Sequence, residues 1–93
     1  MKRTAEIDDG GRGGGVIYID ERGPLRFCWE WSASALEIGI PTAAQWEEQT
    51  GRPLAGRLDM LWFIAERVIA KRGKQGSTFE VVEQPSAWLR IYV

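Results

Sequence analysis

Three charged residues are the first candidates for chemistry. Arg26, Glu30 and Glu37 occupy polar positions in two neighbouring stretches whose apolar residues alternate, as in adjacent β-strands with one exposed face. Two carboxylates that meet across strands can hold a divalent cation or share general-acid and general-base roles. A cross-strand salt bridge accounts for the same residues without any reaction. An enzyme, either hydrolytic or dependent on a metal at Glu30 and Glu37, is therefore only the third functional class we consider.

The chain has no histidine and a single cysteine, Cys28. It lacks the commonest general base and the commonest zinc ligand, and a cysteine nucleophile would have no imidazole to activate it. Because Cys28 stands between Phe27 and Trp29, we expect it to be a small buried hydrophobic residue. The composition thus predicts a protein that is not an enzyme, with no catalytic residue, no resident metal and no cofactor.

The segment 10–15, GGRGGG, has the composition of two kinds of phosphate-binding sequence. A phosphate loop follows a strand and opens a helix, whereas these glycines precede a strand-like stretch. An RNA-binding tail repeats its arginines, whereas Arg12 stands alone after Asp8 and Asp9. Polar and glycine-rich sequence does not offset the entropy of ordering. We therefore expect a flexible N-terminal arm over residues 1–15 and a single domain over residues 16–93.

Basic residues are concentrated in the second half of the chain, because residues 1–50 carry a net charge of −4 and residues 51–93 a net charge of +3. Such a cluster could hold phosphates while aromatic rings stack on bases. The candidate nucleic-acid residues are Arg67, Lys71, Arg72, Lys74, Trp88, Arg90 and Tyr92. Positive charge at a helix C-terminus explains part of the cluster, and the net charge of −1 argues against a general polyanion binder.

The elements that position these residues follow from hydrophobic periodicity. The strand-like stretches are 16–20, 25–32, 35–40, 78–83 and 87–93, with a turn at 21–24. Thr42 and Gln45 have the spacing of a capping box, which predicts a short helix over 43–50. Gly51 and Pro53 then separate it from a long helix that begins near Leu54 and ends at residue 73.

These elements predict an α+β domain with the order β-β-β-α-α-β-β. We expect an antiparallel five-stranded sheet with a short and a long helix packed on one face. The strand order does not follow from the sequence. No apolar run approaches 18 residues, and one cysteine cannot form an internal disulfide. These features are typical of a small cytoplasmic protein of bacterial or phage kind with no membrane attachment.

The long helix, RLDMLWFIAERVIAKR over residues 57–72, is apolar over a wider surface than one core requires. One stripe at helical spacing is expected to face the core: Leu58, Leu61, Trp62, Ala65, Val68 and Ile69. Met60 and Phe63 fall outside this stripe. Either the short helix covers them, with Trp46 or Leu54, or they face a partner.

We therefore predict a small non-catalytic protein–protein interaction module, analogous in size and class to inhibitors and immunity proteins that occlude a surface. The expected partner-binding residues are Trp46, Met60, Phe63, Arg67 and Lys71. The partner is another protein or a second copy, the latter through paired long helices. The alternative is a nucleic-acid-associated module, which salt would distinguish because phosphate contacts weaken steeply with ionic strength.

Overall fold

The computed structural model describes residues 2–8 and 11–93 of the chain. These residues form an α+β structure with one antiparallel sheet and two α-helices, as the sequence predicts. The elements in chain order are β1 (Thr4–Ile7), β2 (Gly13–Asp20), β3 (Gly23–Ser32), β4 (Ala35–Gly39), the 3-10 turn η1 (Ala43–Gln45), α1 (Trp46–Thr50), the 3-10 turn η2 (Leu54–Gly56), α2 (Arg57–Arg72), β5 (Thr78–Val82) and β6 (Trp88–Tyr92).

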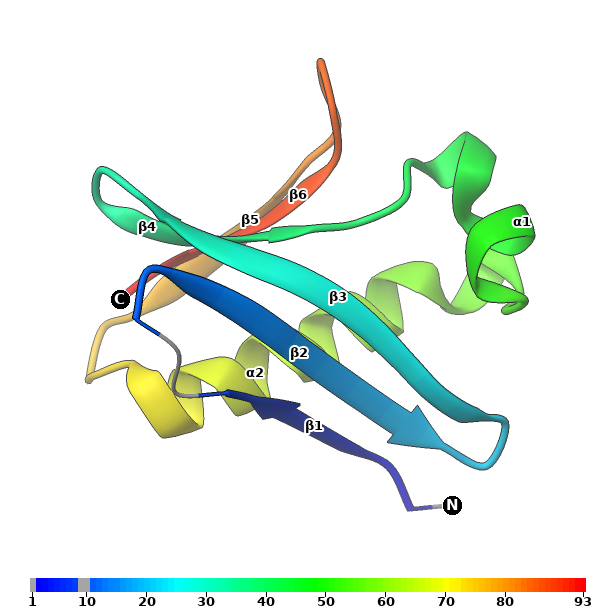
Figure 1. Ribbon diagram of the computed structural model, residues 1–93, viewed down its shortest axis with the longest axis horizontal. Helices are drawn as coiled ribbons and strands as arrows, with labels where there is room; N and C mark the ends of the chain where they lie inside the picture. Colours follow the sequence, from blue (N-terminus) through cyan, green and yellow to red (C-terminus); the bar gives the residue numbers. More distant parts are fainter. Residues whose placement is uncertain (1, 9–10) are drawn as a thin grey trace.

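The sheet of the described residues has six strands in the order β1-β2-β3-β4-β6-β5, so the prediction of five strands was wrong. Neighbouring strands pair antiparallel throughout. The helical segment after β4 carries the chain to the far edge, where β5 forms, and β6 returns between β5 and β4. Helix α2 lies behind the sheet in Figure 1, and α1 lies at one end of it.

The additional strand, β1, lies inside the segment predicted to be a flexible arm. Its residues pair with Val16–Ile19 of β2, and Gly13–Gly15 also belong to β2. The ammonium group of Lys71 on α2 donates a hydrogen bond to the carbonyl oxygen of Ile7 at 3.1 Å. The arm prediction is therefore corrected for β1 and for the start of β2. Residues 1, 9 and 10 of the predicted arm lie outside the described residues.

The glycines of β2 make room for side chains that cross the strand. A Cβ atom placed on Gly14 would lie 2.1 Å from Oδ1 of Asp8. The Asp8 carboxylate accepts hydrogen bonds from the Gly15 N–H at 2.8 Å and from the Trp29 indole N–H at 3.2 Å. A Cβ atom on Gly15 would lie 2.7 Å from a guanidinium nitrogen of Arg26. Close packing thus explains these glycines where the sequence suggested flexibility.

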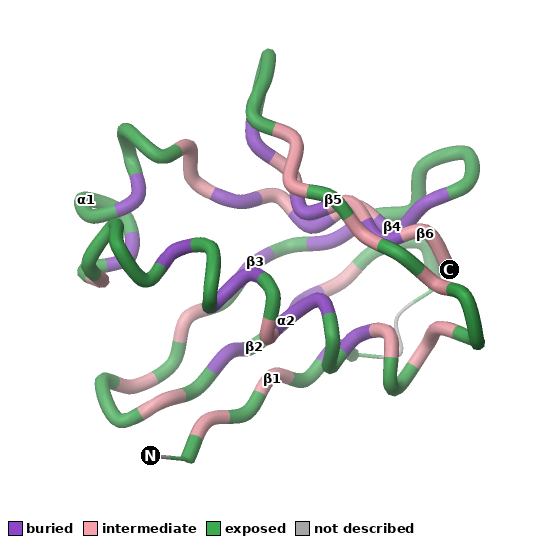
Figure 2. Tube along the Cα trace, turned by 180° about the vertical axis from the view of Figure 1, so that it is seen from behind, coloured by how far each residue is buried: buried purple, intermediate pink, exposed green. Residues whose placement is uncertain are grey.

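Both edge strands of the sheet flank the same helix. On one side, Arg3, which directly precedes β1, places its guanidinium 4.2 Å from the centre of the Phe63 ring of α2. On the other side, the rings of Trp62 and Phe79 meet edge to face at 4.9 Å. Six strands laid flat span about 24 Å, whereas a helix is about 10 Å across. The sheet must therefore curl around α2, and Figure 2 shows this arrangement from the helix side.

The core lies between α2 and the concave side of the curled sheet. Helix α2 contributes Met60, Leu61, Ile64, Ala65 and Val68, and the sheet contributes Ile7, Val16, Tyr18, Phe27, Trp29, Leu36, Ile38, Leu89 and Ile91. Trp46 of α1 is fully buried and closes one end. The Thr42 hydroxyl accepts the Gln45 N–H at 3.2 Å and Gly51 adopts φ = 69°, so the predicted start and end of the short helical segment are confirmed.

A buried arginine joins α2 to the loop between β5 and β6. Arg57 is 4% exposed, and its two terminal nitrogens each donate to an oxygen of Glu83 at 2.8 Å. One of them also lies 3.3 Å from the carbonyl oxygen of Pro41. Hydrogen bonds from Arg57 hold the pKa of Glu83 below its ordinary value of 4.5. This bidentate pair fixes the start of α2 against the end of the hairpin.

Replacement of Gly14 by alanine tests the packing of Asp8. Gly14→Ala must displace a carboxylate that holds two hydrogen bonds, so we expect a loss of about 1–3 kcal/mol in the free energy of unfolding. In an Asp8→Ala background the same replacement should cost much less, because the clash is gone. Urea denaturation of the four proteins measures this coupling, and additive effects would contradict the role assigned to Asp8.

Removal of the Glu83 charge tests the buried arginine. Glu83→Gln should lower the free energy of unfolding at pH 7 by about 1–2 kcal/mol, because Arg57 stays buried with weaker acceptors. Because the pKa of Glu83 is lowered in the folded state, its ion pair with Arg57 stabilises the fold at pH values above the ordinary pKa of 4.5. This stabilisation is lost as the pH falls through the lowered pKa. The difference from the wild type should thus disappear in acid. The exposed Glu48→Gln serves as control, and a difference independent of pH would contradict the assignment.

Candidate functional site

The structure does not bring the predicted partner-binding residues together as one exposed patch. Trp46 is fully buried and Met60 is 5% exposed, so neither residue reaches the surface. Phe63 is half-buried on the β1 side of α2, and the guanidinium groups of Arg3 and Arg67 lie 4.2 and 5.2 Å from the centre of its ring. Lys71 and Arg67 are exposed, but the three apolar members of the patch are packed within the fold.

The surplus apolar surface of α2 exists, but it lies on the opposite side of the helix. Leu58 and Trp62, which were predicted to face the core, are 55% and 56% exposed. The predicted stripe is confirmed for Leu61, Ala65 and Val68, which are buried, and for Ile69, which packs against the core, but it was wrong for Leu58 and Trp62. The sequence pattern correctly predicts that α2 has more apolar surface than the core covers. It does not predict which side the sheet covers, because that side depends on β1, which the sequence did not predict.

Leu54, Leu58 and Trp62 form what we term the apolar ridge. They follow one another at intervals of four residues through η2 and the first half of α2. Leu54 is 45% exposed, so each member shows close to half of its surface to solvent or more. Trp62 is held in place by its contact with Phe79 of β5. The ridge therefore presents large apolar side chains on a fixed helical support.

Carboxylates border the apolar ridge. An oxygen of Glu47 accepts the backbone N–H of Leu54 at 2.9 Å, and Glu66 lies one helical turn after Trp62. Beside Leu58, the charge of Arg57 is buried in its pair with Glu83, whose side chain is 48% exposed. These carboxylates produce a local field that favours positively charged groups on whatever approaches the ridge.

The structure divides the candidate nucleic-acid residues between two faces. On the helix side, the Arg72 guanidinium lies 5.1 Å from the centre of the Trp29 ring and donates to the Asp8 carbonyl oxygen. Lys71 reaches Ile7, as described above, and Arg67 contacts Phe63. Trp88, Arg90 and Tyr92 alternate with the buried Leu89 and Ile91 and project from the other side of the sheet. The predicted set therefore does not form one continuous basic and aromatic surface.

The polar face of the sheet carries a row of charges across its strands. Glu30 lies directly opposite Glu37, as predicted. The partner of Glu37 is Arg90, whose Nε donates at 2.6 Å, and Tyr92 donates its hydroxyl to Glu80 on β5 at 2.5 Å. Arg26 lies instead opposite Ile17 of β2, so the predicted trio is not assembled. No group of three or more acidic, cysteine or histidine residues suited to a metal occurs in residues 2–8 and 11–93.

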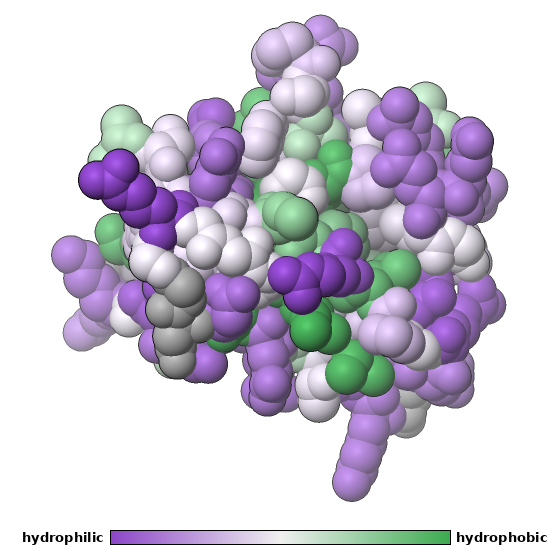
Figure 3. Space-filling view, viewed as in Figure 1, coloured by the Kyte–Doolittle hydropathy of each residue, from purple (hydrophilic) through white to green (hydrophobic). Residues whose placement is uncertain are grey.

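Cys28 is exposed, contrary to the expectation that it is buried. Its neighbours Phe27 and Trp29 point to the core side, at 6% and 2% exposure, so the intervening residue points to the polar face. That face also carries Ile17 and Ile19, which are 38% and 45% exposed. Figure 3 shows hydrophobic and charged side chains mixed on this side of the molecule.

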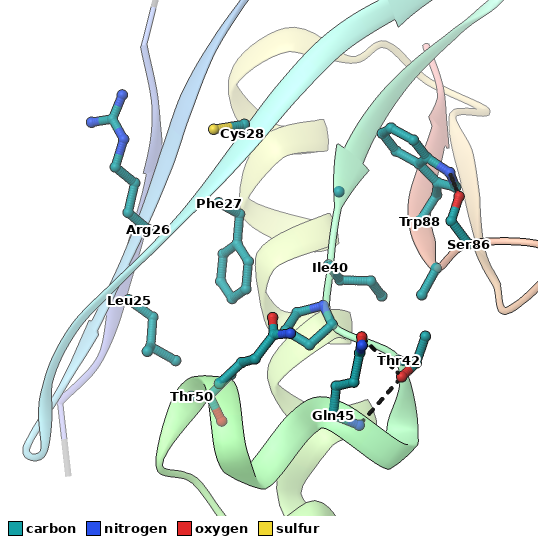
Figure 4. Close-up of a pocket in the computed structure, with 14 residues that line it drawn as sticks. Leu25, Arg26, Phe27, Cys28, Ile40, Thr42, Gln45, Thr50, Ser86 and Trp88 are labelled. Atoms are coloured by element: carbon teal, nitrogen blue, oxygen red, sulfur yellow. Dashed lines mark hydrogen bonds between the residues drawn. The ribbon is translucent and has the colours of Figure 1, made fainter.

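A cleft of about 490 Å³ opens where β3 and β4 diverge. Leu25, Phe27, Ile40, Pro41 and Ala87 supply apolar lining, and Thr42, Gln45, Gln49, Thr50 and Ser86 supply neutral polar groups. Figure 4 shows Phe27 and Ile40 between the diverging strands, with Thr42 and Gln45 at the end nearest the short helix. The remaining lining residues are Arg26, Cys28, Gly39 and Trp88. The sequence does not predict this cleft, because its position depends on where the pairing of β3 with β4 stops.

No protein family, curated protein or solved structure was found to match this chain. Within the part of the chain that the structure describes, no helix is both long and apolar enough to cross a membrane.

Paired substitutions on α2 test which side faces the core. Met60→Ala should reduce the free energy of unfolding by about 2–4 kcal/mol, because it leaves a cavity in a packed core. Trp62→Ala should cost about 1 kcal/mol, the contribution of its single aromatic contact. The stripe predicted from the sequence requires the reverse order. Chemical denaturation of both variants against the wild type distinguishes the two orientations.

Proposed function

We propose that the protein is a non-catalytic protein–protein interaction module that binds a folded protein through the apolar ridge. The observation that carries this proposal is that Leu58 and Trp62 each expose more than half of their surface on a rigid helix. Tryptophan is enriched among the residues that dominate binding energy at interfaces, where burial of an already ordered ring costs little conformational entropy. Small inhibitors and immunity-type proteins act through such occluding surfaces.

The support of the ridge favours this reading. Helix α2 is held on one side by the contact of Lys71 with β1 and of Phe63 with Arg3, and on the other by Phe79. The Arg57–Glu83 pair fixes its first turn. A binding surface on such a fixed element needs little reorganisation when a partner docks.

The charges around the ridge support a partner of particular chemistry. Because Glu47 and Glu66 border the apolar side chains, a complementary surface has an apolar pocket with lysine or arginine residues at its rim. The same carboxylates disfavour a nucleic-acid backbone at this site. A second copy of the chain would bring like charges together at the rim, so we favour a different protein over a homodimer.

Quantitative affinity capture tests the proposal. The wild type, a Leu58→Ser/Trp62→Ser variant and a matched Ile17→Ser/Ile19→Ser variant would be exposed to lysate of the source organism, after folding is verified for each. The two variants each replace two exposed apolar side chains, on opposite faces of the molecule. We expect a protein that binds the wild type and the second variant but loses at least tenfold with the ridge variant, since two central apolar anchors are removed.

The interaction should then be reproduced with the two purified proteins and should weaken little between low and moderate salt. A complex lost equally in both double variants would place the binding elsewhere, and a steep salt dependence would support the nucleic-acid alternative instead. Sedimentation velocity of the pure protein tests whether a second copy of the chain binds the ridge. Reversible dimers that the ridge variant abolishes would show that the partner is a second copy and not a different protein.

A further inference from the structure

The cleft exists because β3 continues after its pairing with β4 has ended. The ladder between them runs from Ser32–Ala35 to Trp29–Ile38 and stops there. Strand β3 remains paired with β2 down to Gly23, whereas β4 stays with β6 through Gly39 and Trp88. Beyond β4 the Ile40 N–H donates to the Ala87 carbonyl oxygen at 3.2 Å. Half of β3 is thus an internal edge strand that faces the cleft.

The backbone groups at this internal edge can be assigned by alternation. In an antiparallel ladder, every second residue directs its N–H and C=O groups to the same side. The Trp31 N–H donates to the Arg12 carbonyl oxygen at 3.0 Å, so odd-numbered residues of β3 face β2. Even-numbered residues face β4 where it is paired and the cleft where it is not, which places the N–H and C=O of Arg26 at the cleft.

Pro24 is consistent with this assignment. It lies in β3 opposite Ile19, at an even-numbered position. Proline occurs within sheets where its missing N–H would point away from the neighbouring strand. Its place in β3 therefore leaves the pairing with β2 intact and marks the cleft side as the free edge. The register and the proline support the same assignment independently.

The lining of the cleft suits an extended polypeptide. Phe27 and Ile40 provide apolar contacts between the two strands, while Thr42 and Gln45 provide neutral hydrogen-bonding groups near the short helix. None of these lining residues is acidic, and the guanidinium of the one basic residue among them, Arg26, lies over Gly15 of β2 and not in the cleft. The volume of about 490 Å³ lies within the usual range of about 300–1,000 Å³ for ligand sites.

We propose that this cleft binds an extended, uncharged peptide segment of a partner as an added strand on β3. The peptide would pair with the N–H and C=O of Arg26 and place alternate apolar side chains on Phe27 and Ile40. Main-chain hydrogen bonds supply affinity in this mode of recognition, and the pockets for alternate side chains supply specificity. The site is separate from the apolar ridge, and the proposal does not depend on the ridge.

Two substitutions at one position isolate the backbone contribution. Arg26→Ala and Arg26→Pro both remove the guanidinium group, but only proline removes the N–H that faces the cleft. The probe is the capped peptide acetyl-Thr-Val-Thr-Val-Thr-amide, and its fully N-methylated counterpart is the control. Titrations followed by ¹H–¹⁵N chemical shifts measure the affinities, and thermal unfolding verifies that each variant is folded.

We expect the capped peptide to shift the signals of cleft residues and to bind Arg26→Pro about tenfold more weakly than Arg26→Ala. Binding should also slow hydrogen exchange of the Arg26 amide in the wild type, a measurement that stands even if the proline variant does not fold. The Leu58→Ser/Trp62→Ser variant should bind the peptide normally, which separates this result from the ridge. No binding, or equal binding of the N-methylated peptide or of the two Arg26 variants, would overturn strand addition.

Discussion

The curl of one sheet around one helix is the constraint on which the rest of this structure depends. The edge strands β1 and β5 contact opposite sides of α2, β1 through Ile7 and Lys71 and β5 through Phe79 and Trp62. An amphipathic helix on a flat sheet needs one apolar stripe, whereas a helix enclosed by a curled sheet buries side chains over a much wider angle. The breadth of apolar sequence in α2 is thus a requirement of the fold, and the ridge is the part of that breadth that the curl leaves uncovered.

The two sides of the helix are closed by different means. On the β1 side, cationic side chains of α2 reach the short edge strand and the residue after it, through Lys71 with Ile7 and Arg72 with Asp8. On the β5 side the chief contacts are the Trp62–Phe79 pair and the Arg57–Glu83 ion pair. A positive charge at the end of a helix can therefore serve strand docking. This role explains why a basic sequence cluster did not become a basic surface.

The local sequence pattern predicted most of the helices and strands, but it did not predict how they are arranged relative to one another. Alternation located five strands, the Thr42 cap and Gly51 bounded the short helical segment, and the Glu30–Glu37 pair followed from adjacent strands. Strand β1 was missed because four residues beside a glycine-rich segment carry little periodic signal, and its stability comes from contacts distant in sequence. The covered side of α2 then could not be predicted, since periodicity gives the apolar direction of a helix but not what lies on each flank. The cleft depends on the exact end of a ladder, which no sequence pattern of this chain records.

The outer edges of the sheet, at β1 and β5, and the unpaired edge of β3 inside the sheet are each protected against pairing with other molecules. Unpaired strand edges invite aggregation, and proteins limit it with short strands, charges and proline. The outer edge at β1 has four residues, and the outer edge at β5 carries Glu80 at its centre. The internal edge of β3 has Pro24, and the short helix limits access to one end of the cleft. Such protection restricts pairing to a chain short enough to enter the cleft. An edge that is both shielded from the sheets of other molecules and left unpaired within its own sheet has the properties of a selective strand-binding site.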